Sequence, residues 1–381
     1  MTTYRLITPT DVLFLRGNKL FGGAGEHGAA EMPPWPSVFA GAMASRILAD
    51  AGKLQEITAY PDKAEAILAD AAGSKFACTF LGILKDQKDV LLPLPADLVV
   101  LKTEDGDLRI CQMIPGAVSE TLTCSTVLPL VPVLHVSDRS KPVTGLWMDL
   151  YGWRCHLQGD LPEQRSLVPS SELWEMDHRL GIARDYGAGT AAEGKIYTSE
   201  AVSLKHNTTF LVGFNGENIP DCGLLRLGGD GRGADITKVP DDKMLPVDVG
   251  KPQGGWTGFR IILISPGIFP KGWLPPGCEK SEDGIFFEWK GVRAQLKAAA
   301  IGRHGVISGW DMANHRPKPA QKVVPAGSVY WFQVLEGDTS ELESVWKEGL
   351  YSVHGNMDQE YVTNRRREGF GRVWFGAWQP K

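Results

Sequence analysis

Short strand-like runs separated by glycine and proline restrict the folds open to this chain. Its 381 residues include 44 glycines and 25 prolines, which favour many turns and loops over long helices. Strands are predicted at 4–8, 11–15, 76–84, 96–102, 108–114, 196–204, 208–213, 258–264, 298–308, 328–335 and 372–378. Residues 227–233 are predicted to be a glycine-rich hairpin loop. The hydrophobic fraction of 43% is enough to bury a sizeable core.

Helical spacing occurs near both ends of the chain. Phe39, Met43 and Ile47 recur every four residues after Ser37, which is predicted to be the N-cap. A second helix is predicted at 62–71. A third is predicted to start at a capping box formed by Ser340 and Glu343, with Gly349 at its end.

Helices among strands in both halves indicate an α+β fold. We expect two ferredoxin-like (RRM-like) modules with loop and hairpin insertions, the first at 1–195 and a divergent second at 196–381. Residues 115–195 lack a clean period, and this predicts an irregular insertion in the first module.

The charge distribution is uneven along the chain. The formal net charge of −5 argues against a free, non-specific nucleic-acid binder, which is usually basic overall. Two windows are nevertheless basic: 291–322, with six Lys and Arg against Asp311, and 361–381, with four arginines and Lys381 against Glu368. Such windows predict a local groove for phosphates, although charge runs are also typical of solvated faces.

Residues 364–376 combine arginines, glycines and aromatic residues. The arginines offer charge to phosphates, and exposed N–H groups around the glycines can bind anions. The candidate RNA-binding residues here are Arg365, Arg366, Arg367, Gly369, Gly371 and Arg372. The alternative is a glycine turn that opens the last strand, with solvated arginines beside it.

Two further segments contribute candidates. In the second basic window they are Arg303, His304, Lys318 and Lys322, and in the glycine-rich loop near the start they are Arg16, Lys19, Gly22 and Gly23. That loop is suited to wrapping a nucleic-acid backbone or to connecting two elements.

Catalytic and metal-binding motifs are missing from the sequence. There is no Walker motif, no HExxH and no nucleophile elbow, and six scattered cysteines show no zinc or redox spacing. His27 and His304 are the best general-base candidates, but neither has a partner visible in the sequence. We therefore expect no cofactor, no metal and no enzyme activity. The opening residues show no secretory signal and no apolar run spans a membrane, so we expect a cytoplasmic protein with reduced cysteines.

An ordered set of segments resembles the third-subunit RAMP proteins of the type III-B CRISPR Cmr effector complex. The segments are 10–16, 21–23, 33–41, 179–182, 193–197, 227–232, 308–311 and 317–330, with 369–376 similar to the glycine-rich loop of the wider RAMP superfamily. The match spans most of the chain and keeps its order, although 50–130 and 235–290 carry little of it.

This resemblance implies a non-catalytic subunit with two RRM-like modules that holds the 5′ tag of the CRISPR RNA. It also implies docking on the large polymerase/cyclase-like subunit and on the backbone RAMP subunit. By the same resemblance, Gly369, Gly371 and Arg372 belong to an RNA-contacting loop.

Three other interpretations stay open. One is a metal-independent endoribonuclease of the same superfamily that matures CRISPR RNA and uses His27 or His304 as its base. Another is the equivalent subunit of a different type III subtype. The last is a protein scaffold without RNA contact, in which the basic windows have no role.

Overall fold

The computed structural model describes residues 2–15, 27–118, 124–137, 140–184, 187–188, 190–239, 245–353 and 357–380. The chain forms two compact units, each assembled from three separate stretches. Unit 1 comprises Met1–Gln87, Ser171–Pro240 and Val306–Gln321, and unit 2 comprises Lys88–Ser170, Asp241–Gly305 and Lys322–Lys381. These interleaved units do not coincide with the consecutive modules 1–195 and 196–381, and the ferredoxin-like character of the modules stays a prediction.

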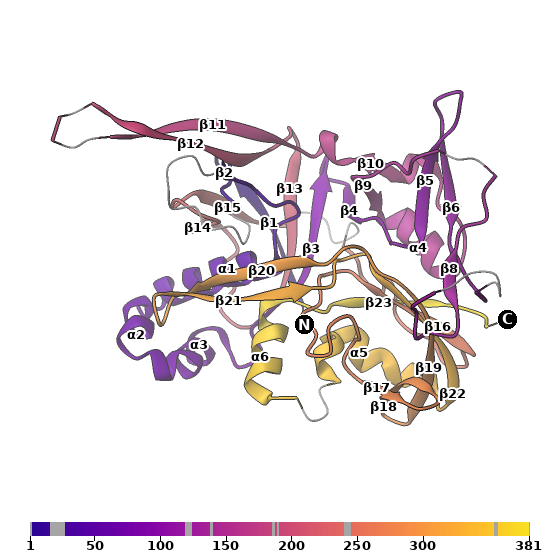
Figure 1. Ribbon diagram of the computed structural model, residues 1–381. Coiled ribbons are helices and arrows are strands. Elements are labelled where there is room, and N and C mark those ends of the chain that lie inside the picture. The colour runs from indigo at the N-terminus through magenta and orange to yellow at the C-terminus, as the bar shows by residue number, and fades with distance from the viewer. Residues whose placement is uncertain are drawn as a thin grey trace. The chain divides into compact units, whose positions relative to one another are not determined.

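Unit 1 is built on antiparallel strands in the order β3-β13-β1-β15-β14. Their bounds are β1 Thr3–Pro9, β3 Ala77–Lys85, β13 Thr208–Asn215, β14 Gly223–Arg226 and β15 Gly233–Lys238. Leu6 of β1 lies opposite Leu211 of β13 and Thr237 of β15, so the first strand is inserted between strands formed some 200 residues later. The α+β class is confirmed, with helices α1 (Pro36–Asp50), α2 (Leu54–Ala59) and α3 (Ala64–Ala72) beside this sheet (Figure 1).

The apolar face predicted for the first helix is confirmed. Phe39, Met43 and Ile47 are buried, and the Phe39 ring meets that of Phe210 in β13 edge-on at 5.0 Å. The predicted N-cap at Ser37 is wrong, because Trp35 is the N-cap residue and Pro36 opens the helix. Proline suits that position because its missing N–H needs no partner in the first turn.

Two hairpins extend unit 1. Strands β11 (Trp174–Arg184) and β12 (Ala191–Leu204) pair antiparallel and form a long two-stranded ribbon in Figure 1, and β12 also pairs with a short parallel strand, β2 (His27–Gly28). On β11, Leu180 is 71% exposed and Ile182 lies on the same face. The second hairpin joins β20 (Gly305–Asp311) to β21 (Arg316–Val323).

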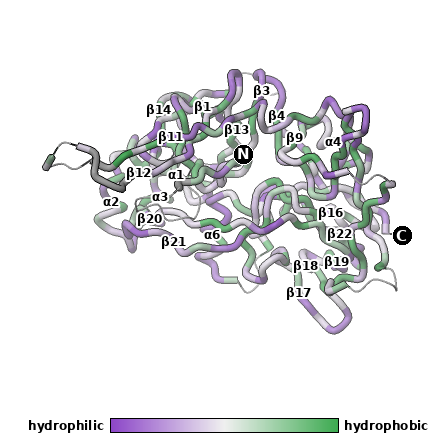
Figure 2. The backbone as a smooth tube through the Cα atoms, turned by 45° about the horizontal axis from the view of Figure 1, so that its top comes forward, coloured by the Kyte–Doolittle hydropathy of each residue, from purple (hydrophilic) through white to green (hydrophobic). Residues whose placement is uncertain are grey.

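Unit 2 contains a six-stranded sheet in the order β17-β18-β19-β22-β16-β23, together with the smaller groups β10-β9-β4, β5-β6 and β7-β8. The six strands are β16 Gly258–Leu263, β17 Cys278–Ser281, β18 Gly284–Trp289, β19 Val292–Ala300, β22 Val329–Glu336 and β23 Val373–Ala377. The others are β4 Asp89–Pro93, β5 Leu98–Lys102, β6 Leu108–Gln112, β7 Ile114–Gly116, β8 Val131–Val133, β9 Leu146–Asp149 and β10 Leu167–Pro169. Hydrophobic stretches, green in Figure 2, alternate with purple segments along both units.

The helices of unit 2 are α4 (Leu150–Gln158), α5 (Glu343–Glu348) and α6 (Gln359–Glu368). Helix α4 packs on β23, where the rings of Trp153 and Trp374 meet edge-on at 5.1 Å. The helix predicted near 340 and its end at Gly349 are confirmed, but the capping box predicted at Ser340 and Glu343 is wrong. A 3-10 turn, Thr339–Leu342, precedes α5, and Asp338 accepts the capping hydrogen bond.

Most predicted strands are confirmed, and three predictions need correction. Residues 11–15 contribute only an isolated bridge from Leu13 to Val202. The run at 298–308 is divided between β19 and β20. The stretch 115–195 is not irregular throughout, since it contains α4 and the whole of β11.

Candidate nucleic-acid interface

Unit 1 contains a cavity of about 1310 Å³. It is lined by residues of α1, α2 and α3, by the turn between β14 and β15, by Thr10, Phe14 and Leu15, and by the β20–β21 hairpin. The helix side is apolar, while the hairpin and the turn add polar and charged groups. This combination suits a ligand with flat apolar faces and charged edges.

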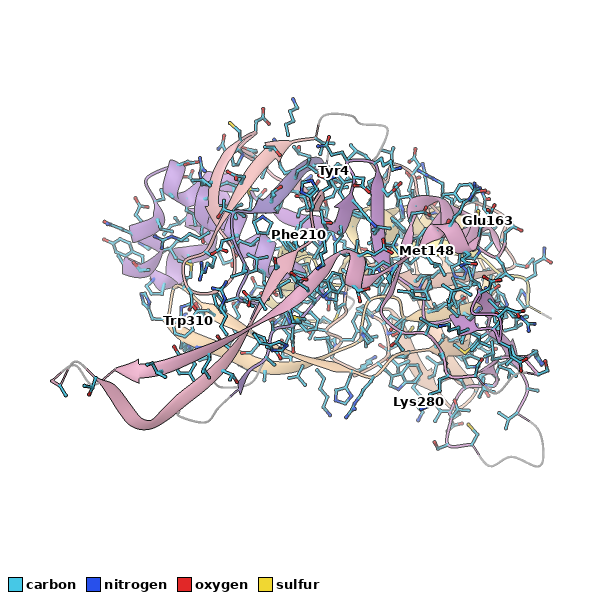
Figure 3. The ribbon with its side chains drawn as sticks, turned by 90° about the horizontal axis from the view of Figure 1, so that it is seen from above. Tyr4, Met148, Glu163, Phe210, Lys280 and Trp310 are labelled. Carbon is cyan, nitrogen blue, oxygen red and sulfur yellow. The ribbon has the colours of Figure 1, made fainter. Side chains whose placement is uncertain are left out.

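The hairpin side of the cavity presents an exposed aromatic ring. Trp310 is 58% exposed on β20, and Figure 3 labels it beside the β20–β21 ribbon. Met312 follows it at the hairpin turn, and its sulfur lies 3.5 Å from the Ser45 hydroxyl of α1. An exposed tryptophan in a cavity wall offers a stacking face for a nucleobase.

The turn of this hairpin is held by Asp311. Its carboxylate accepts hydrogen bonds from the backbone N–H and the side-chain amide of Asn314, at 3.1 and 2.9 Å. Burial would raise the pKa of Asp311, but these hydrogen bonds and the charge of Lys318 outweigh it and lower that pKa. The ordered turn keeps Trp310 and Lys318 in the cavity wall.

Three cations line the cavity: Arg46, Arg226 and Lys318. Arg46 is already occupied, because its Nε lies 2.9 and 2.8 Å from the carboxylate oxygens of Asp50 and its guanidinium also contacts the Leu224 carbonyl. Arg226 is exposed on β14 and forms no ion pair within the described part of the chain. Arg226 is therefore the cation of this lining best placed to meet a phosphate.

Phe14 lines the cavity and also contacts Arg179 of the β11–β12 hairpin. The guanidinium carbons of Arg232 and Arg179 lie 5.2 and 5.9 Å from the centre of its ring. Arg232 is held by Asp11 at 2.5 Å. The predicted hairpin loop at 227–233 is confirmed, and Gly229 donates its N–H to the Phe14 carbonyl at 2.8 Å.

The other acidic residue in the lining is Glu31. Its side chain accepts a hydrogen bond from the Trp35 indole N–H at 2.9 Å, and its backbone N–H donates to the Leu15 carbonyl at 2.9 Å. Burial raises the pKa of Glu31, and the hydrogen bond from Trp35 opposes this.

The predicted RNA-binding residues are only partly brought together. Lys318 lines the cavity, whereas Arg303, His304 and Lys322 are exposed residues of unit 2 and do not line it. Arg16, Lys19, Gly22 and Gly23 lie outside the described residues. So does the side chain of His27.

The predicted C-terminal arginines lie on a helix and are already in contact with other residues. Arg365 reaches Glu368 at 2.6 Å and stacks over the Tyr361 ring at 5.1 Å. Arg366 pairs with Glu348 at 2.7 Å, and Arg367 is half-buried. Residues 364–368 do not form a loop. They are the last residues of α6, which Asp358 caps at its start and Gly369 ends with φ of 85°.

The glycine-rich turn after α6 has no free N–H groups. Gly369 and Phe370 donate to the carbonyls of Arg366 and Arg365, Gly371 donates to Pro266 at 2.8 Å, and Arg372 donates to the Ser265 hydroxyl at 2.9 Å. Arg372 itself is only 5% exposed, so the alternative of solvated arginines beside the turn is wrong for this residue. RNA contact by Gly369, Gly371 and Arg372 stays a prediction, and the hydrogen bonding of this turn offers it no phosphate site.

Sequence reasoning missed most of the cavity lining. Phe14, Trp35, Arg226 and Trp310 are far apart in the sequence, and only the pairing of β14, β15 and the hairpins brings them to one wall. The available signal was the Ser308–Asp311 segment, whose tryptophan is exposed beside Gly309 at the end of a strand.

No cluster of His, Cys, Asp or Glu suitable for a metal ion occurs in the described ranges. Over the same ranges, the helices are too short or too polar to cross a membrane.

Comparisons with known proteins agree with the resemblance seen in the sequence. No individual curated protein matches the chain. Two solved structures contain similar chains: type III-B Cmr-beta bound to cognate target RNA, and the same complex with AMPPnP in state 1. In each case the TM-score is 0.52 at 15% identity over 97% of this chain, covering 96% and 98% of the other chains. At that identity the likeness shows the fold alone.

The model of one protein family matches residues 5–378, nearly the whole length. The chain belongs to the Cas_Cmr3 family of CRISPR-associated proteins.

Proposed function

We propose that this chain is a CRISPR RNA-binding subunit of a type III-B Cmr effector complex, without catalytic activity of its own. In this role it holds the 5′ tag of the guide RNA. It also bridges the large polymerase/cyclase-like subunit to the RAMP backbone of the complex. Family membership over residues 5–378 supports the assembly, and the cavity of unit 1 supports the RNA contact.

The observation that carries the RNA-binding proposal is the mixed lining of this cavity. Single-stranded RNA is usually held by aromatic faces that stack on bases and by cations that meet phosphates. Trp310 and Trp35 supply the aromatic faces, and Arg226 and Lys318 supply the cations.

Docking on partner subunits is supported by apolar residues on the surface of unit 1. Leu180, Ile182 and Met176 are exposed on the same face of β11. Exposed apolar patches of this kind are typical of protein–protein contacts. The acidic balance of the whole chain also suits contacts with basic partner surfaces.

The direct test is reconstitution of the Cmr complex with and without this chain, using CRISPR RNA labelled at its 5′ end. We expect the chain to crosslink to the 5′ tag and to protect it from nuclease. Assembly in its presence should also join the large subunit to the RAMP backbone. A tag that stays unprotected in the presence of the chain, together with assembly that is unchanged in its absence, would contradict the proposal.

Salt dependence tests which cations meet phosphates. Each phosphate contact on single-stranded RNA contributes about 0.7 to the slope of log affinity against log salt. Arg226→Ala and Lys318→Ala should each lower that slope by up to about 0.7 and weaken binding at low salt. Lys280→Ala removes the same charge from an exposed strand of unit 2 and should leave the slope unchanged. Wild-type slopes in both cavity variants would show that the RNA lies elsewhere.

The purified chain should not cleave RNA. The general-base candidates His27 and His304 are separated by most of the sequence, and His304 is exposed. The measurement is incubation with labelled CRISPR precursor RNA, with and without divalent metal. Site-specific cleavage that disappears in His27→Ala or His304→Ala would favour the endoribonuclease instead.

A further inference from the structure

Glu31 presents a carboxylate to the cavity of unit 1. This negative charge repels phosphates, and burying it costs free energy. Its side chain is half-buried in a lining that is mostly apolar. A charged group in such a place needs hydrogen-bond donors to offset the loss of water. In a groove for RNA, its negative charge weakens binding unless the RNA itself supplies those donors.

The contacts of Glu31 leave part of its acceptor capacity open. Trp35 donates to Oε2, while Oε1 accepts no hydrogen bond from the residues that the structure describes. A carboxylate can accept about four hydrogen bonds. The Trp35 bond, and the bond from the Glu31 backbone to Leu15, fix the position of the side chain in the wall.

We propose that Glu31 recognises an unpaired guanine of single-stranded RNA held in this cavity. The inference rests on the proposed RNA-binding function and assigns base preference to one residue. Guanine carries two adjacent donors on its Watson–Crick edge, N1–H and the N2 amino group, and a carboxylate can accept both.

The other bases fit less well for electrostatic reasons. Adenine and cytosine each present one amino group beside a ring nitrogen that is itself an acceptor. Uracil presents one N–H between two carbonyl oxygens. In each case a carboxylate oxygen faces a second acceptor, and the repulsion offsets the hydrogen bond formed.

The surroundings of Glu31 can hold the rest of such a nucleotide. Trp35 and Trp310 line the same cavity and offer rings for stacking, while Arg226 and Lys318 in the same lining supply positive charge for the phosphates. The cavity volume of about 1310 Å³ exceeds that of a typical small-ligand site and accommodates several nucleotides.

The test measures affinity of the full chain by fluorescence anisotropy, within the assembled complex where binding is weak. The probes are labelled octamers of adenosine with one guanosine placed at each position in turn. For at least one position, we expect binding about tenfold tighter than for the all-adenosine octamer. Inosine at that position lacks the N2 amino group and should lose much of the gain.

Glu31→Gln should reduce the difference between the two RNAs to within about twofold, because an amide offers one acceptor and places a donor against N1–H. Glu56→Gln, an exposed carboxylate of α2 outside the cavity lining, should keep the full difference. The inosine comparison uses the wild-type chain, so it stands even where Glu31→Gln folds poorly.

A wild-type chain that binds every octamer without preference for guanosine would overturn the role of Glu31 and leave the proposed function standing. A guanosine preference that survives in Glu31→Gln would also overturn the role of Glu31 and would leave the proposed function standing. Failure of the assembled complex to bind any octamer through this chain would overturn the proposed function itself.

Discussion

Arg260→Met should lower the free energy of unfolding of unit 2 by about 3–5 kcal/mol, the usual cost of removing one partner from a buried ion pair. Arg260 lies on β16 and is 2% exposed, and Asp97 is 0% exposed. The Arg260 guanidinium lies 3.2 Å from Asp97 Oδ2 and donates to the carbonyls of His156 and Leu157 at 2.5 and 3.5 Å. Methionine fills similar space but leaves the carboxylate without its cation.

The rest of this buried cluster explains why the loss should be large. His156 Nε2 lies 3.0 Å from Asp97 Oδ1, and the Gln112 amide donates to Oδ2 at 3.3 Å. Burial alone would raise the pKa of Asp97, but the hydrogen bond and charge of His156 and the charge of Arg260 lower it below 3.8. Without Arg260, only His156 and Gln112 oppose the effect of burial on this carboxyl.

Two companion variants separate lost charge pairing from lost packing. Asp97→Asn combined with Arg260→Met removes the unpaired charge and should restore part of the stability, so the two single effects should not add. Arg293→Met removes a half-buried arginine near Glu288 and Glu336 and should cost less than about 1 kcal/mol. Urea unfolding followed by tryptophan fluorescence measures all three. A cost below about 1 kcal/mol for Arg260→Met would contradict the prediction.

The lowered pKa of Asp97 also fixes the sign of a pH effect. Because the folded-state pKa lies below the unfolded value, this group contributes stability that is fully present above about pH 4. That contribution is lost as the pH falls from there through the folded value. The wild-type chain should therefore lose stability more steeply below pH 4 than Asp97→Asn does.

Gly371→Ala should destabilise unit 2 by about 2–5 kcal/mol, which combines the cost of a left-handed residue with that of a clash. Gly371 has φ of 67°, and a Cβ there would lie 2.8 Å from the Tyr351 ring. That ring cannot move freely, because the Tyr351 hydroxyl bonds both the N–H and the carbonyl of Ile268. The added methyl group must therefore displace packed atoms.

Gly272→Ala is the matched control in the same unit. Its φ is 73°, and a Cβ there meets no atom within 4 Å, so only the backbone cost of about 1–2 kcal/mol should remain. Equal losses in the two variants would show that the clash with Tyr351 is relieved at little cost. A Gly371→Ala chain with wild-type stability and lost RNA binding would instead support a phosphate site at this turn.

Local sequence patterns predicted several elements well. The spacing of Phe39, Met43 and Ile47 predicted the buried face of α1, because a helix places residues four apart on one side. Gly349 ends α5 with φ of 84°, a conformation that glycine adopts without strain. The predictions that failed were mostly caps and element ends, such as Ser37 and Ser340, where a neighbouring residue took the capping position.

The candidate site was less accessible from the sequence. Clustered arginines at 365–367 indicated a nucleic-acid contact, yet α6 places two of them beside Glu368 and Glu348. The charge of a window does not reveal whether its cations already have partners. Trp310 and Lys318 stood in a predicted basic stretch, but their meeting with α1 and with the β14–β15 turn depends on how the hairpins pack.

The sequence by itself determined the strand-rich α+β composition, the α1 core face, the glycine-rich hairpin loop and, through motifs in order along the chain, the Cas_Cmr3 family. These depend on residues close together in the chain or on order alone. Only the tertiary structure decided that Arg260 is buried against Asp97, and that the N–H groups of 371 and 372 are satisfied by Pro266 and Ser265. Burial and hydrogen-bond satisfaction are set by partners more than a hundred residues away, and strand pairing, which local patterns leave open, brings those partners together.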